Sequence, residues 1–173
     1  MDSKGEGRLE RATTLIYTLA FLFLFLPAVD LVLNTWPMQP GIVSWRYAAV
    51  GLASGFTLTP FLGLLIALLT ALYFGHRRVQ IAVGVIAAVV GLVTVVASMA
   101  FVLDVLQVRR SVAPEGRWTF DAGAGRAFFK HLAGMIFLGM TSYVAFATLA
   151  PASGRRARTP LVVRSPATPD QTG

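Results

Sequence analysis

The sequence predicts an all-α integral membrane protein, a bundle of four transmembrane helices with both termini in the cytoplasm. Of its 173 residues, 55% are hydrophobic and 13% are charged, against roughly 45–50% and 25% in soluble domains. The charged residues gather in short basic clusters that separate long uncharged runs. An α-helix needs about 20 apolar residues to cross a hydrocarbon core of roughly 30 Å, and these runs are close to that length or longer.

The first span is expected at Ala12–Leu33, after a cytoplasmic segment over residues 1–11. A cleaved signal peptide is the alternative, but the apolar run is longer than a usual signal core. The residues that follow, Pro27 to Asp30, also lack a small-residue cleavage site. We therefore expect a retained anchor. Residues 21–26 alternate Phe and Leu without a small side chain, which predicts a face turned to lipid or to a large partner.

The second and third spans are expected at Tyr47–Phe74 and Ile81–Val108. Both exceed the length of a perpendicular crossing, so they should tilt or project from the bilayer. The connection before them, residues 34–46, contains two prolines and should be irregular. Pro60 lies inside the second span and should kink it, because proline cannot donate a helical hydrogen bond.

Small side chains predict how these two helices pack, because helices in lipid associate through close backbone approach. The alternative is that Gly and Ala are simply frequent in membrane helices. We expect the second and third spans to form the tightest antiparallel pair. The second span has small residues at every fourth position, namely Gly51, Gly55, Thr59, Gly63, Ala67, Ala71 and Gly75, and the third has Gly84, Ala87, Ala88 and Gly91.

The fourth span is expected at Phe128–Leu149, which completes a transmembrane domain over residues 12–149. The segment before it, Arg109–Ala127, should be an irregular outer loop, with Asp121 as an N-cap or first-turn acid. Residues 150–173 are rich in Pro, Ser, Thr and Arg and predict a disordered basic cytoplasmic tail. The tail is interpreted as a stop-transfer signal, or alternatively as a docking segment for a partner.

The distribution of basic residues gives the orientation. Nine Lys and Arg residues fall on the side of the termini and of the Gly75–Gln80 turn, and six fall on the other side. A basic excess favours the cytoplasmic side. Trp36, Trp45 and Trp118 all fall on the outer side, where indole rings prefer the headgroup layer. The preference for Arg over Lys, together with abundant Ala, Gly and Val, is typical of a GC-rich bacterial genome, so we expect the membrane to be a bacterial inner membrane.

Asp30 and Asp104 are the only acids inside the expected spans, and both lie near the outer ends. Ionisable groups at such positions are costly and are therefore candidates for function. One interpretation is a set of interfacial ion pairs that orient the helices. The other is a site for a proton, an ion or a ligand. The expected outer polar cluster consists of Asp30, Arg46, Asp104, Arg109, Lys130 and His131.

No residue pattern predicts catalysis, a cofactor or a metal. The chain has no cysteine, which excludes thiolate sites and a cysteine nucleophile. His76 and His131 are expected on opposite sides of the membrane, so they cannot share a metal or haem; His131 could at most be a single axial ligand. No span combines Ser, His and an acid at one depth.

The expected function is that of a small non-catalytic accessory or structural subunit of a larger membrane complex. The partners would be the lipid bilayer and membrane-protein subunits or further copies of the chain, and not nucleic acid. The alternative is a small transporter or channel with Asp30 and Asp104 at its outer mouth. It is weakened because the midplane offers only hydroxyls, such as those of Thr59, Ser98 and Thr141. A lipid-modifying enzyme is the third choice.

Overall fold

The computed structural model describes residues 3–149, and within this range all regular structure is helical. The all-α class is therefore confirmed for the described residues. The expected tail at 150–173 lies outside them. The elements are α1 (Ser3–Thr35), α2 (Val43–Ala53), α3 (Leu58–Phe74), α4 (Arg77–Arg109), the short 3-10 helix η1 (Pro114–Gly116) and α5 (Arg117–Ala147).

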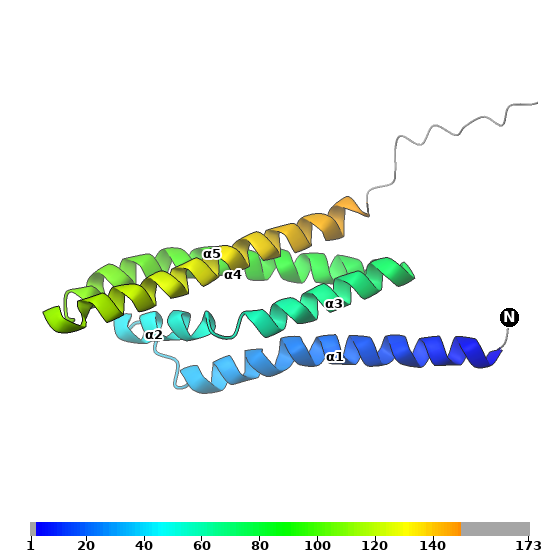
Figure 1. Ribbon diagram of the computed structural model, residues 1–173, viewed down its shortest axis with the longest axis horizontal. Helices are drawn as coiled ribbons and strands as arrows, with labels where there is room; N and C mark the ends of the chain where they lie inside the picture. The colour runs from blue at the N-terminus through cyan, green and yellow to red at the C-terminus, as the bar shows by residue number, and fades with distance from the viewer. Residues whose placement is uncertain (1–2, 150–173) are drawn as a thin grey trace, which may run out of the picture.

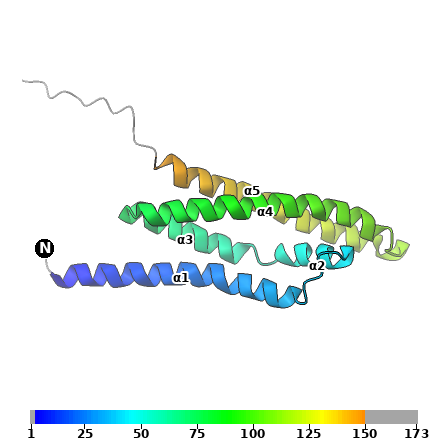
Figure 2. The same ribbon diagram turned by 180° about the vertical axis from the view of Figure 1, so that it is seen from behind.

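The helices run side by side in layers (Figures 1 and 2). α1 packs mainly on α3, while α4 and α5 pair with each other on the opposite side of α2 and α3. The α3–α4 turn marks one end of the molecule, here called the proximal end, and the α4–α5 turn marks the distal end (Figure 1). α1 is thus a peripheral helix held chiefly by one neighbour.

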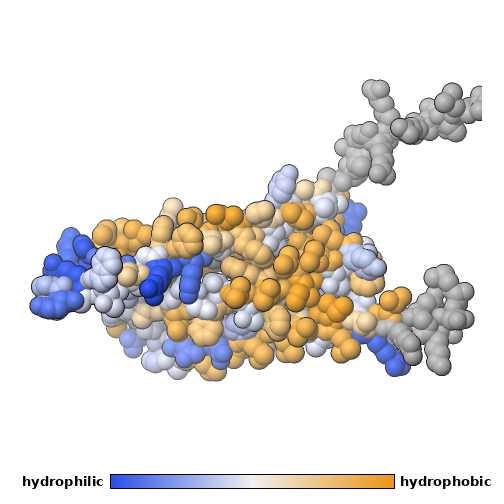
Figure 3. Space-filling model, viewed as in Figure 1, coloured by the Kyte–Doolittle hydropathy of each residue, from blue (hydrophilic) through white to orange (hydrophobic). Residues whose placement is uncertain are grey.

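Two helices are long and apolar enough to cross a bilayer, Leu9–Thr35 within α1 and the whole of α4. α2 and α3 together count as a third if they form one span, bent by 48°. α5 is not among these candidates. On the face seen in Figure 3, hydrophobic side chains cover the middle of the molecule, and hydrophilic ones gather mainly toward the distal end, with fewer at the proximal end. The helices therefore indicate a membrane protein.

The expectation of one continuous helix over Tyr47–Phe74 is wrong, because the chain leaves the α-helix between α2 and α3. Pro60 explains the position of the break: it has no N–H for the carbonyl of Phe56, and its ring crowds that carbonyl. At the break the N–H of Gly55 donates to the Leu52 carbonyl at 2.8 Å, a shorter-range bond than an α-helix makes.

The α4–α5 connection is shorter than expected, because α5 begins at Arg117 and not near Phe128. Glycines at 123 and 125 suggested a loop, yet each costs a helix only about 1 kcal/mol relative to alanine, and tertiary contacts offset this cost. The N-cap of α5 is Gly116. The expectation that Asp121 starts the last helix is therefore wrong, since it lies more than one turn inside α5.

The tightest pairs are α4 with α5 and α1 with α3, so the expected pairing of the second and third spans is also corrected. An added Cβ on Gly63 of α3 would lie 2.7 Å from the carbonyl oxygen of Ala20 in α1. An added Cβ on Gly84 of α4 would lie 3.0 Å from the Cβ of Ala145 in α5. The small residues therefore permit close approach, but to helices other than those expected.

The other glycines expected to mediate packing differ in their surroundings. Gly91 faces Leu138 of α5, whose Cβ would be 3.5 Å from an added methyl group. An added Cβ on Gly51 meets nothing within 4 Å, and one on Gly55 meets only a carbonyl of its own turn. Thr59 and Ala88 are exposed.

Candidate functional site

The best-defined polar contact joins α2 to α4 at the distal end. The Arg46 guanidinium donates from Nε to Oδ2 of Asp104 at 3.0 Å and from Nη2 to Oδ1 at 2.7 Å. Its Nη1 donates to the carbonyl of Pro40 at 2.9 Å. The Asp104 side chain is only 3% exposed and that of Arg46 is 33% exposed. This two-pronged geometry is the strong form of an ion pair and fixes both orientation and distance.

An aromatic wall lies beside this ion pair. Phe101, one turn before Asp104 on α4, is almost fully buried. The ring of Tyr47 stacks on Phe101 and on Phe120 of α5, with 5.3 Å between ring centroids in each case. Apolar rings exclude water, so the Asp104 carboxylate depends strongly on its arginine partner.

His131 of α5 also lies close to Phe101, with 6.0 Å between the two ring centroids. It is buried, and its Nδ1 lies 2.7 Å from the carbonyl oxygen of Ala127. A carbonyl can only accept, so Nδ1 carries the hydrogen and donates it. His76 is at the proximal end, where its Nδ1 lies 2.8 Å from the hydroxyl of Tyr17.

Arg109 pairs with an acid that the sequence interpretation assigned to helix capping. Its Nε and Nη2 each donate to Asp121 at 2.8 Å, which ties the end of α4 to the start of α5. Both side chains are about half exposed, and exposed pairs contribute roughly 0.2–1 kcal/mol. The sequence gave no signal for this contact, because Arg109 and Asp121 were separated by a segment expected to be an irregular loop.

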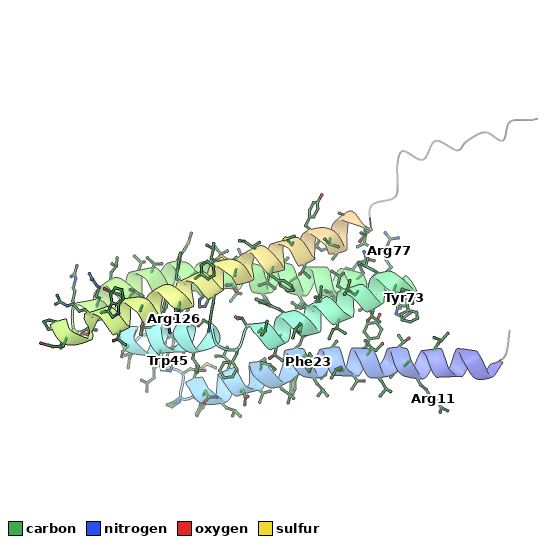
Figure 4. All side chains as sticks on the ribbon, in the orientation of Figure 1. Arg11, Phe23, Trp45, Tyr73, Arg77 and Arg126 are labelled. Atoms are coloured by element: carbon green, nitrogen blue, oxygen red, sulfur yellow. The ribbon has the colours of Figure 1, made fainter. Side chains whose placement is uncertain are left out.

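The remaining members of the expected cluster lie apart from the ion pair. Asp30 is exposed and makes no ion pair with the described residues; its backbone carbonyl accepts from Asn34 Nδ2 at 2.8 Å. Lys130 is also exposed. The structure thus brings Arg46 and Asp104 together, with His131 nearby, and leaves the other members separate. Figure 4 places Trp45 and Arg126 toward the distal end and Arg11, Tyr73 and Arg77 toward the proximal end.

Gln80 is a buried polar residue that sequence reasoning took only as the end of a turn. Its Nε2 donates to the carbonyl of Ala145 at 2.8 Å and to the hydroxyl of Thr148. The signal in the sequence that could have identified Gln80 is a polar side chain in the first turn of an apolar helix.

We expect Gln80→Leu to weaken the α4–α5 pair by about 1 kcal/mol, the usual worth of a hydrogen bond between membrane helices. Unfolding in detergent by increasing SDS measures the change. Gln107→Leu is the matched control, because Gln107 is exposed on the same helix. An equal effect of both variants would contradict the assigned role of Gln80.

A shallow groove of about 460 Å³ runs along the surface between α4 and α5 and is lined by residues of these two helices alone. Its lining has no carboxylate, imidazole or basic side chain. It can therefore hold an apolar surface, and its polar side chains are the hydroxyl-bearing Ser142 and Tyr143. The lining includes Ala88, Gly91, Val95, Met135, Gly139 and Ser142.

The buried polar residues Asp104, His131 and Gln80 thus all make hydrogen bonds between or within helices. No three His, Cys, Asp or Glu side chains between residues 3 and 149 gather as a metal site would require. Compared with protein-family models, curated proteins and solved structures, the chain matches none of them.

Proposed function

We propose that the chain is a four-span membrane protein that serves as a non-catalytic accessory or structural subunit of a larger membrane complex. The observation that carries the proposal is the use of its buried charged pair. Arg46 of α2 and Asp104 of α4 neutralise each other's charge, so this ion pair contributes to the packing of the two helices. The bidentate geometry leaves the carboxylate little freedom to bind another ligand.

In this proposal α5 is the fourth span. It runs antiparallel to α4, as the contact of Gly84 with Ala145 and that of Gly91 with Leu138 require. Its uncharged part from Leu132 to Ala147 lies alongside the apolar α4. Both termini then lie on one side of the bilayer. The basic proximal end favours the cytoplasmic side of a bacterial inner membrane.

The surface of the spans supports a role in assembly. Only 6% of the apolar window of α1 is buried inside the chain, so α1 can contact other subunits along most of its length. The groove between α4 and α5 is lined by small side chains, which allow the backbone of another helix to approach closely.

Extraction in a mild detergent followed by size-exclusion chromatography tests the proposal. We expect the chain to elute with a larger complex, and Gly139→Leu to release it by filling the groove. Val93→Leu, at an exposed position of α4 outside the groove lining, should leave the complex intact. Elution of the wild-type chain as a homo-oligomer without other subunits would contradict the proposal.

A small transporter or channel is the second candidate, and the break between α2 and α3 favours it. Interrupted helices expose backbone groups that bind ions or substrates in many transporters. Here the proline at position 60 cannot donate to the carbonyl of Phe56. Proton flux into proteoliposomes that contain only this chain would favour this candidate, particularly if Asp104→Asn abolished flux without changing assembly.

A further inference from the structure

The register of α4 and α5 sets the height of each residue along the pair. Gly84 lies against Ala145, and Gly91 lies against Leu138, so seven residues on one helix correspond to seven on the other. Continuing this antiparallel register toward the distal end places Lys130 of α5 at about the height of Met99 in α4.

The length of α4 exceeds the thickness of a bilayer. Its apolar sequence begins at Val79, directly after Arg77 and Arg78 at the proximal end. From Val79, a hydrocarbon core of roughly 30 Å ends about 20 residues later, near Met99. The rest of α4, through Arg109, adds about 15 Å. Headgroups occupy only about 5–8 Å on each side, so the end of α4 extends past them.

The last part of α4, the turn and the first part of α5 therefore project from the membrane. We call residues 100–130 the distal hairpin. Figure 1 shows that the α4–α5 turn extends past the end of α1, which leaves the tip without that neighbour.

The distal hairpin exposes large apolar side chains on both of its helices. Past the headgroup layer, Leu106 of α4 is 57% exposed and Trp118 of α5 is 82% exposed, whereas the exposed Leu103 and Phe129 lie at headgroup height. Lipid tails do not reach this height if the core ends near Met99. Large apolar side chains that face water are typical of a protein interaction surface.

The same hairpin has an excess of positive charge. Its acids Asp104 and Asp121 already pair with arginines, which leaves Glu115 as the one acid in the hairpin outside an ion pair. Four exposed cations make no ion pair with the described residues: Arg110, Arg117, Arg126 and Lys130. A partner that covers this surface should therefore be acidic, because complementary charge steers association and excludes basic competitors.

We propose that the distal hairpin docks an acidic segment of a membrane-protein partner, whose apolar side chains cover Leu106 and Trp118. This inference rests on the proposed accessory role and on the four-span placement. Anionic lipid headgroups are a less suitable partner. The hairpin continues the direction of α4 and α5 out of the bilayer, so its tip lies past the headgroup layer. The docking surface is separate from the groove between α4 and α5.

Site-specific photocrosslinking in native membranes tests the inference. A photoreactive residue at Leu106 or at Trp118 should form an adduct with one protein, and the crosslinked peptide should have a net negative charge. The same residue at Leu92, which is exposed on α4 at hydrocarbon depth, should not form that adduct.

Charge reversal at Arg110, Arg117 and Arg126 together should reduce the adduct at least tenfold. All three side chains are exposed, so the fold should be kept. Replacement of the same three arginines by lysine keeps their positive charge, so this variant is the matched control and should leave the adduct unchanged. Adducts with lipid alone, an adduct that survives charge reversal, or a crosslinked peptide without negative charge would each overturn the inference. If one of these results is obtained but the chain still copurifies with a larger complex that Gly139→Leu disrupts, the accessory role stands and only the docking assignment fails.

Discussion

We expect Arg46→Gln to lower the free energy of unfolding by about 3 kcal/mol, because removing one partner of a buried ion pair leaves the other charge uncompensated. The Asp104 carboxylate is only 3% exposed, so water is poorly placed to replace the lost donors. Because Arg46 is itself one-third exposed, the effect should fall at the lower end of the range for buried pairs. SDS unfolding of the purified chain in detergent measures it.

Neutral variants of Arg46 and Asp104 test whether the two side chains stabilise the protein as a pair or independently of each other. We expect Asp104→Asn to destabilise the chain as well, and the double variant R46Q/D104N to cost clearly less than the sum of the single changes. Additive costs would show that the two side chains do not stabilise the protein through each other. Intact assembly with lost activity in Asp104→Asn would instead favour a functional site.

We expect Gly63→Ala to destabilise the contact between α1 and α3 by about 2 kcal/mol, a cost typical of overpacking. The new methyl group would lie 2.7 Å from the backbone oxygen of Ala20 and 3.0 Å from the Cβ of Phe23. Backbone atoms cannot rotate away, so α1 would have to shift as a whole. SDS unfolding, with the distance between α1 and α3 followed by spin labels, reports both effects.

Gly51→Ala is the matched control for this variant. An added Cβ at Gly51 meets nothing within 4 Å, so the helix propensity of alanine should raise stability by up to about 1 kcal/mol. Equal destabilisation by both substitutions would show that the close approach of α1 and α3 does not depend on Gly63.

The sequence allowed the positions of the long helices to be predicted, because uncharged length is a direct consequence of bilayer thickness. It did not allow the neighbours of each helix to be predicted. Small residues at every fourth position wind around a helix, so they show that close contacts exist without showing which helix makes them. Gly63 turned out to face α1 and Gly84 to face α5.

The helix ends were predicted less well, for physical reasons that differ between sites. Pro60 was expected to produce a kink, yet the chain leaves the α-helix before Leu58, because Pro60 has no N–H to donate to the carbonyl of Phe56 one turn earlier. At the distal end, Gly123 and Gly125 were taken as loop residues, but α5 continues through both of them. Helix propensity is a weak preference that tertiary contacts override.

For the polar residues, the sequence predicted only their depth in the membrane and not which side chains form contacts. Asp104 and Arg46 were expected at one level because both lie near the outer ends of spans, and the structure places them in contact. Asp121 was assigned to capping because the start of α5 was placed too late along the chain. Its true position on the helix directs its carboxylate to Arg109. The functional meaning of the outer polar cluster stays a prediction.

Cysteine labelling tests the membrane topology most directly, since the chain has no cysteine of its own. Single cysteines would replace Met38 in the α1–α2 connection, Arg78 at the proximal end and Leu92 on the exposed face of α4. With a membrane-impermeant reagent, we expect Met38→Cys to react in intact cells and Arg78→Cys only after permeabilisation. Leu92→Cys should stay unlabelled in both. Labelling of the first two from the same side, or of Leu92→Cys in an intact bilayer, would contradict the account.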